Sequence, residues 1–304
     1  MAMKIKLLLV YCGVLVMFVF ISCTNSLKKA DKKVVLVLQP EEQFPLTHFM
    51  ELLQQRISRL ELEANLEVID EKTLKLKCAI SGDPNLFKEK LTANKTIGFS
   101  EIISPSYSYS FWNQIIDSIH DNAYQFAPNG LDGAVFLTSK LSDTAYINTI
   151  LKEPASVMGL ETLIDSNSKF LWGLEDKVTN SIPLYMVKLN KDGALGLEGD
   201  IIKQASFGEH FSGNALVNVT FKEKASLSWE QMTGEAYREG TFIAVVVNDR
   251  VLSAPGVSSG PIVGGKTQIL GDFSEEQAEA LVAQLNLGYL PPVNVMSYQV
   301  EPLP

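Results

Sequence analysis

Few side chains in this sequence have the types and spacing that catalysis or metal binding needs. The three histidines, His48, His120 and His210, stand far apart, with no HExxH pattern and no paired cysteines near them. Zinc and similar metals need ligands at short, fixed spacings, so structural or exposed roles are favoured for these histidines. We therefore expect no metal and no cofactor.

Two further stretches contain residues that do chemistry in other proteins, and each has a simpler structural interpretation. Glu275, Glu276 and Glu279 begin a predicted helix, where carboxylates interact favourably with the helix macrodipole. The stretch 193–199 is rich in glycine, but it lacks the spacing of a P-loop or of a GxGxxG fingerprint. No nucleophile elbow, in which a GxSxG sequence joins a strand to a helix, and no Ser-His-Asp set is visible. We therefore expect a protein that is not an enzyme.

A loop near the C-terminus has the composition of a binding segment. Residues 256–265 are rich in glycine and serine and lie between two predicted buried strands, which is typical of an exposed loop that can present its backbone to an extended peptide. The alternative is a turn that merely lets the strands cross, and both interpretations stay open. The candidate polypeptide- or partner-binding residues are Ser253, Pro255, Gly256, Ser258, Gly260, Gly264 and Gly265.

The first residues have the anatomy of a secretory signal. Lys4 and Lys6 precede an apolar run over residues 7–21, which is short for a membrane span. Ser22 and Cys23 follow, and a small residue before a cysteine at this place resembles a bacterial lipoprotein cleavage site. We expect lipidation at Cys23; an uncleaved N-terminal anchor is the alternative. Both place the chain in the cell envelope, facing the periplasm, with the choice of inner or outer membrane open.

Charge and cysteine content exclude further classes. The formal net charge is −9, and loss of two lysines with the signal makes it more negative, so we expect no nucleic-acid partner. Cys12 would leave with the signal, which makes Cys78 the free thiol of the mature chain. Cys78 shares one face of an alternating strand with Leu74 and Leu76, and a buried, inert thiol is favoured over a nucleophile.

The pattern of apolar residues predicts an α+β fold. In the first third, a strand at 34–38 precedes an amphipathic helix at 46–60, then a hairpin over 66–80, a helix over 84–91 and a strand at 96–103. This β-α-β-β-α-β order is the split βαβ arrangement of ferredoxin-like folds. Later elements are predicted with the following bounds: a helix near 112–119, a strand at 134–137, a helix at 143–151, a strand at 215–221, a helix at 225–239, strands at 241–247 and 267–273, and a helix at 274–287.

Two separate parts of the sequence carry a pattern that can be recognised. The C-terminal part combines a buried strand, Ser-Ala-Pro, Gly-Gly and a Leu-Pro step. Its pieces are residues 244–247, 251–255, 264–265, 269–273 and 288–292. The N-terminal part carries Arg56-Ile57 and the Gly82-Asp83-Pro84 step. Both parts resemble the first periplasmic domain of SecD, the membrane-integrated accessory subunit of the Sec protein-export machinery. This likeness implies a ferredoxin-like split βαβ base with an inserted α+β head subdomain.

The resemblance also implies a division of the chain and a role. The expected parts are a signal peptide at 1–22, a tether at 23–33, a base subdomain beginning at 34–103, a head subdomain at 104–273 with a family-variable insert at about 104–198, and a returning helix and strand at 274–304. It implies binding to translocating or unfolded polypeptide, or docking on the Sec export complex, without a proton-driven motor in this chain. The alternative is an envelope binding or structural lipoprotein that uses the fold for an unrelated ligand. The oligomeric state stays open.

Overall fold

The structure is a computed structural model that describes residues 30–41, 44–94, 97–119, 132–152, 167–210, 213–271 and 274–303. The expected signal peptide, the lipidation site Cys23, most of the tether and His120 lie outside these ranges. Within them, no helix is long and apolar enough to cross a membrane.

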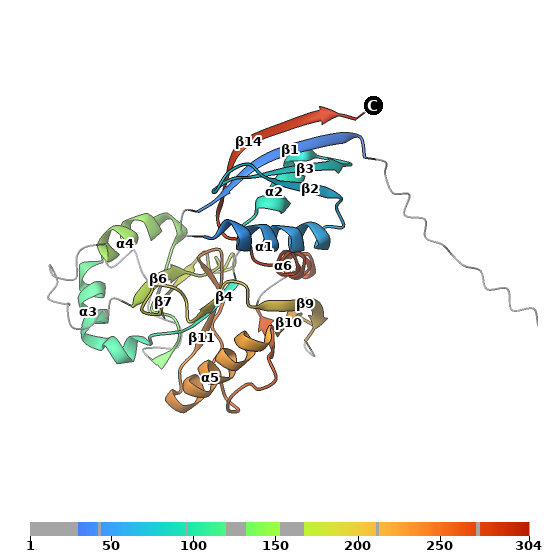
Figure 1. Ribbon diagram of the computed structural model, residues 1–304. Coiled ribbons are helices and arrows are strands. Elements are labelled where there is room, and N and C mark those ends of the chain that lie inside the picture. The colour runs from blue at the N-terminus through green and yellow to red at the C-terminus, as the bar shows by residue number, and fades with distance from the viewer. Residues whose placement is uncertain are drawn as a thin grey trace, which may run out of the picture.

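The first sheet has four strands in the order β14-β1-β3-β2, and each strand runs antiparallel to its neighbours (Figure 1). Its strands are β1 (Lys32–Pro40), β2 (Ala64–Val68), β3 (Leu74–Ile80) and β14 (Val293–Pro302). Helices α1 (Leu46–Arg59) and α2 (Pro84–Thr92) lie on one face of it. This is the split βαβ arrangement that the sequence predicts, with β14 as the fourth strand.

Buried and less buried side chains alternate along β3, and the buried ones lie on the face that the helices cover. Leu74, Leu76 and Cys78 of β3 are buried, while the intervening lysines are only partly so. They pack with Phe49 and Leu53 of α1 in one apolar cluster. Burial raises the pKa of the Cys78 thiol, which fits the expected inert role.

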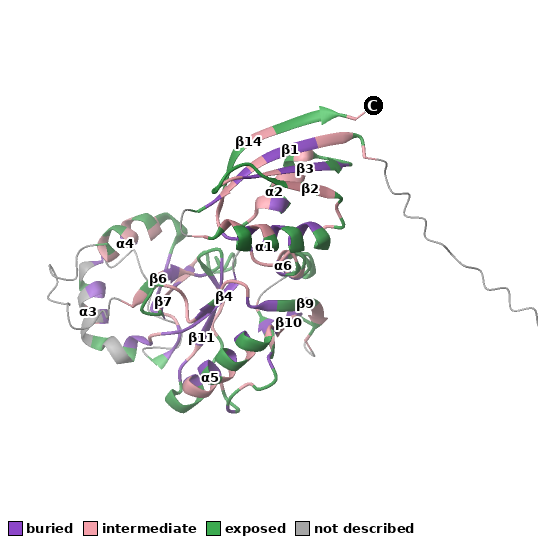
Figure 2. Ribbon diagram, in the orientation of Figure 1, coloured by how far each residue is buried: buried purple, intermediate pink, exposed green. Residues whose placement is uncertain are grey.

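Strand β4 (Ile97–Glu101) differs from the sequence-based expectation, which placed it in the base. It pairs instead with β11 (Ile243–Val247) in a second sheet, in the order β12-β11-β4-β8. All five of its residues are buried, which requires cover on both faces. Strand β14, the edge strand of the first sheet, is by contrast largely exposed, as Figure 2 shows. We propose a base of residues 32–92 and 293–302, with the head between them.

The largest apolar core of the head is shared by two sheets and two helices. The second sheet is completed by β8 (Leu197–Glu198) and β12 (Arg250–Ser253). The third sheet, in the order β13-β10-β9, contains β9 (Ile202–Glu209), β10 (Ala215–Phe221) and β13 (Lys266–Leu270). Helices α5 (Glu223–Glu239) and α6 (Glu275–Asn286) contribute to the core that these sheets share.

Helix α6 begins and ends where the sequence predicts. Ser274 accepts a hydrogen bond from the backbone of Gln277, whose side chain bonds back to Ser274, and Gly288 follows the helix with φ +80°. Its packing differs from the expectation that it completes the base. Its buried residues, Ala278 and Leu281 among them, belong to the head core.

A fourth sheet, in the order β5-β7-β6, lies in the segment 104–198 that the sequence describes least well. Its strands are β5 (Leu137–Ser139), β6 (Ser168–Trp172) and β7 (Ile182–Lys188), flanked by α3 (Tyr109–Ser118) and α4 (Thr144–Leu151) and by short 3-10 turns at Pro105–Ser108 and Leu141–Asp143. Ile102, just beyond β4, bridges to Val187 of β7. This bridge brings the end of β7 against the end of β4.

Arg56 holds the junction between base and head. The side chain is 2% exposed and donates to the carbonyls of Leu91 at 3.1 Å, Ala93 at 2.7 Å and Gly288 at 2.7 Å. Burial, with a smaller contribution from Arg59, lowers the pKa of the Arg56 guanidinium to about 10, so it stays charged at neutral pH. The three carbonyls offset the cost of burying that charge.

Candidate functional site

The loop at residues 256–265 is attached to α5 and to the end of β10 by hydrogen bonds. The amide of Ile262 donates to Thr233 Oγ1 at 2.9 Å, and the carbonyl of Gly265 accepts from the amide of Phe221 at 2.8 Å. Gly260 and Gly264 have φ +91° and +80°, values that favour glycine. The loop is therefore docked on the head at several points along its length.

The seven candidate residues differ in their exposure. Pro255, Gly256, Ser258 and Gly264 are exposed, Ser253 is half-buried, and Gly260 and Gly265 are buried. None of the seven lines either of the two cavities described below. Three of the exposed members, Pro255, Gly256 and Ser258, lie close together in sequence, and the role of the loop in binding stays a proposal.

Replacing Thr233 by valine is expected to destabilise the protein by about 1–2 kcal/mol and to loosen this loop. The hydroxyl donates to the carbonyl of Trp229 at 2.8 Å and accepts from Ile262, so its removal leaves the Ile262 amide without its partner. The measurement is thermal unfolding together with amide exchange of residues 257–265. Thr149→Val is the matched control, because that exposed hydroxyl bonds only to the carbonyl one turn earlier in its own helix. Equal loss of stability in both variants would show that the hydrogen bond between Thr233 and Ile262 does not stabilise the loop.

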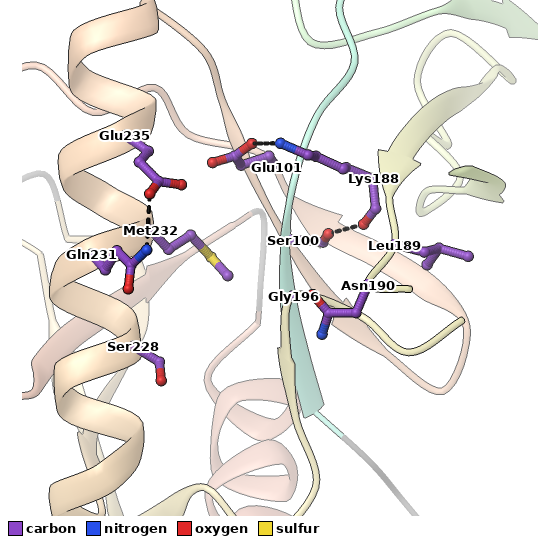
Figure 3. A pocket seen from close by; sticks show the side chains of 10 residues that line it. All are labelled: Ser100, Glu101, Lys188, Leu189, Asn190, Gly196, Ser228, Gln231, Met232 and Glu235. Carbon is purple, nitrogen blue, oxygen red and sulfur yellow. Dashed lines mark hydrogen bonds and ion pairs between the residues drawn. The ribbon is translucent and has the colours of Figure 1, made fainter. Parts of the chain in front are cut away.

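The first cavity lies in the head between α5 and the ends of β4 and β7, and it has a volume of about 250 Å³ (Figure 3). Lys188 Nζ and Glu101 Oε2 form an ion pair at 3.1 Å on one side of it. Ser100 Oγ donates to the carbonyl of Lys188, which fastens β4 to the end of β7. On the helix side, Gln231 Nε2 donates to Glu235 Oε1 at 3.0 Å.

A second cavity of about 270 Å³ adjoins the first, since both are lined by Glu101, Lys188 and Leu189. Its other walls combine apolar and polar groups. They come from Ile102, Ile103, Asn167, Glu239 and Thr241. The Lys188–Glu101 ion pair is thus a shared element between two open cavities.

The electrostatics of this site are dominated by carboxylates. The hydrogen bond to Glu101 raises the pKa of the Lys188 ammonium; burial opposes this, and the charges of Glu101, Glu239 and Glu235 add to it. The Glu101 side chain is only 11% exposed, so its charge is compensated mainly by Lys188. Each cavity then has one carboxylate beyond the ion pair, Glu235 in the first and Glu239 in the second.

This arrangement is suited to binding. Among the described residues, no group of three or more histidine, cysteine or carboxylate side chains is placed to hold a metal ion. The cavities instead offer charged groups, hydroxyls and apolar walls side by side, a combination that recognises polar and apolar parts of a ligand together.

Neither cavity was predicted from the sequence, because none of the residues that line them was a candidate site residue. Gln231, Glu235 and Glu239 recur every four residues on α5, and that spacing could have indicated a polar stripe on the helix. Lys188 ends a strand that the sequence analysis did not predict, although Ile182, Leu184 and Met186 alternate with other residues as a strand requires.

Comparisons with known proteins fit this architecture. Residues 180–292 match the family described as SecDF, P1 head subdomain. The chain is 29% identical over 160 residues to the protein translocase subunit SecD of Rickettsia bellii, covering 49% of this chain and 29% of the relative. It is 33% identical over 127 residues to the SecD of Calditerrivibrio nitroreducens, covering 40% of this chain and 23% of the relative. The chain thus spans less than a third of the length of these curated relatives.

A solved structure supports the fold. A crystal structure of SecDF in a super-membrane-facing form aligns with 90% of this chain and 30% of its own length, with a TM-score of 0.50 and 19% identity. The chain is therefore SecD-like: it resembles the first periplasmic domain of SecD, and residues 180–292 correspond to the SecDF P1 head subdomain.

Proposed function

We propose that this chain is a non-enzymatic protein of the cell envelope that binds extended polypeptide through the two cavities of its head. The SecD relatives are protein translocase subunits, which supports a place in protein export. On this proposal the chain is anchored by a lipid at Cys23, faces the periplasm, and binds passively, without a motor of its own, to translocating polypeptide or to the Sec complex.

The observation that carries the proposal is the pair of adjoining cavities at the Lys188–Glu101 ion pair. Each is smaller than the roughly 300 Å³ at which small-molecule sites begin. Each is instead of a size for side chains, and two neighbouring cavities on one surface suit successive side chains of an extended chain. The region that matches the P1 head subdomain contributes α5 and the end of β7 to both.

The exposed loop residues around Ser258 form a second proposed contact. They lie on the surface of the head beside α5, to which the loop is bonded through Thr233. A polypeptide that extends beyond the cavities could therefore pass over this segment and use its backbone groups.

The test is photo-crosslinking in living cells, with a photoreactive residue in place of Gln231 at the first cavity or of Ser258 in the loop. The control replaces Gln54, an exposed residue of α1 in the base. We expect secreted precursors or Sec subunits to be captured through Gln231 and not through Gln54. Capture of one unrelated envelope protein would favour the alternative of a lipoprotein with another ligand. Equal capture through Gln231 and Gln54 would contradict the proposed site.

A further inference from the structure

The lining of the first cavity includes two side-chain amides from opposite walls. Gln231 comes from α5, and Asn190 comes from the segment that follows β7 (Figure 3). Both residues are exposed. The charged groups of Glu101 and Lys188, in the same cavity, are paired with each other at 3.1 Å. A side-chain amide carries donors and an acceptor but no charge, so it matches a peptide group of any sequence.

Each of the two amides is oriented by a hydrogen bond within the chain. Gln231 Nε2 donates to Glu235 Oε1 at 3.0 Å, one turn later on α5, and Asn190 Nδ2 donates to the carbonyl of Leu195 at 2.8 Å. The backbone of Asn190 is held as well, because its N–H donates to the carbonyl of Ala194 at 2.7 Å. Within the described residues, the two side chains bond only through their NH2 groups. An NH2 group has two hydrogens, so each amide keeps its carbonyl oxygen and one N–H for a ligand.

An adaptable side chain forms part of the apolar lining. Met232 extends from α5 toward the opposite wall (Figure 3), where a Cβ atom at Gly196 would lie 2.6 Å from Met232 Cε. The glycine therefore gives the end of the methionine its space. An unbranched thioether side chain adjusts to neighbours of different shape, so this lining does not select one apolar side chain over another.

The two amides suit the geometry of an extended polypeptide. Such a chain presents its N–H and C=O groups perpendicular to its direction, as it does in a sheet. A chain that lies between the two walls can thus bond to Gln231 on one edge and to Asn190 on the other. Because both amides are oriented before the chain binds, little side-chain freedom is lost on binding.

We infer that Gln231 and Asn190 bind the backbone of the polypeptide in the first cavity. This inference rests on the proposed function and specifies what the cavity recognises, namely main-chain groups and not particular side chains. The protein then binds extended chains of unrelated sequence with similar affinity.

The experiment measures fluorescence anisotropy of the full chain with two labelled unstructured peptides. Both have the same side chains, but in one of them esters replace the central backbone amides, which removes N–H donors with little change in shape. We expect the amide peptide to bind about tenfold more tightly, as the loss of two ordinary hydrogen bonds predicts.

Variants assign this preference to the two side chains. Gln231→Met is expected to reduce it to about threefold, and the double variant with Asn190→Leu is expected to remove it. Gln54→Met, at an exposed position of α1 in the base, is the matched control and is expected to keep the full preference. Thermal unfolding of each variant checks that it is folded.

The outcomes separate the inference from the proposed function. Equal binding of the amide and ester peptides would overturn backbone recognition and leave polypeptide binding in place. A preference that survives unchanged in folded Gln231→Met would also overturn the inference, because it would place the backbone contacts elsewhere. Binding of neither peptide would overturn both proposals.

Discussion

Replacing Arg56 by methionine is expected to lower the free energy of unfolding by about 3–5 kcal/mol. The guanidinium is buried and donates to three backbone carbonyls, one of them, at Gly288, far away in sequence. Methionine fills part of the volume but offers no donor, so all three carbonyls lose this partner. Because these carbonyls belong to the end of α2 and to the segment after α6, the loss also loosens the junction between base and head.

The measurement is urea unfolding, supported by a thermal midpoint that falls by roughly 6–12 °C for a loss of 3 kcal/mol. Arg59→Met is the control, since Arg59 lies one turn further on the same helix and is exposed. We expect it to change stability by less than about 0.5 kcal/mol. An unfolding midpoint for Arg56→Met that equals that of Arg59→Met would show that the buried guanidinium contributes nothing to the junction.

Replacing Phe99 by alanine is expected to cost about 4 kcal/mol. Phe99 is 0% exposed at the centre of β4, and its ring lies 5.0 Å from the ring of Trp229 and 5.3 Å from that of Phe221, both in edge-to-face geometry. The substitution removes the buried ring, leaves a cavity, and ends two aromatic contacts that add to the burial term.

Phe207→Ala is the matched control, because this ring packs against the same core but is only partly buried. Its expected cost is about 1–2 kcal/mol. Chemical unfolding of both variants in parallel checks the difference. If the two substitutions cost the same, β4 would not lie at the centre of the head core.

Local signals in the sequence predict the elements of the base well. Asp83 caps α2 by accepting from the amide of Asn85, with Pro84 in the first turn, as the residue types indicate. The apolar stripe of α1 is buried at Phe49, Leu53 and Ile57. Caps and helical periodicity depend on residues a few positions apart, so a single sequence contains this information.

Sheet membership depends on distant residues and was predicted less well. The strand at 97–101 has the same apolar character whether it joins the base or the head, and its partner β11 lies far along the chain. The two cavities could not be predicted for the same reason. Lys188 and Glu101 are 87 residues apart, and no local pattern indicates that they form an ion pair. The loop around Ser258 was visible only because glycine, serine and proline mark loops by composition.

Hydrogen–deuterium exchange of the full chain, with and without an unfolded polypeptide at saturating concentration, tests polypeptide binding by the head most directly. We expect slower exchange at residues 187–196 and 228–241, which form the walls of the two cavities, and unchanged exchange at residues 46–59 of α1. Protection confined to α1 and the base sheet, or no protection anywhere, would contradict the assignment of the two cavities as the polypeptide-binding site.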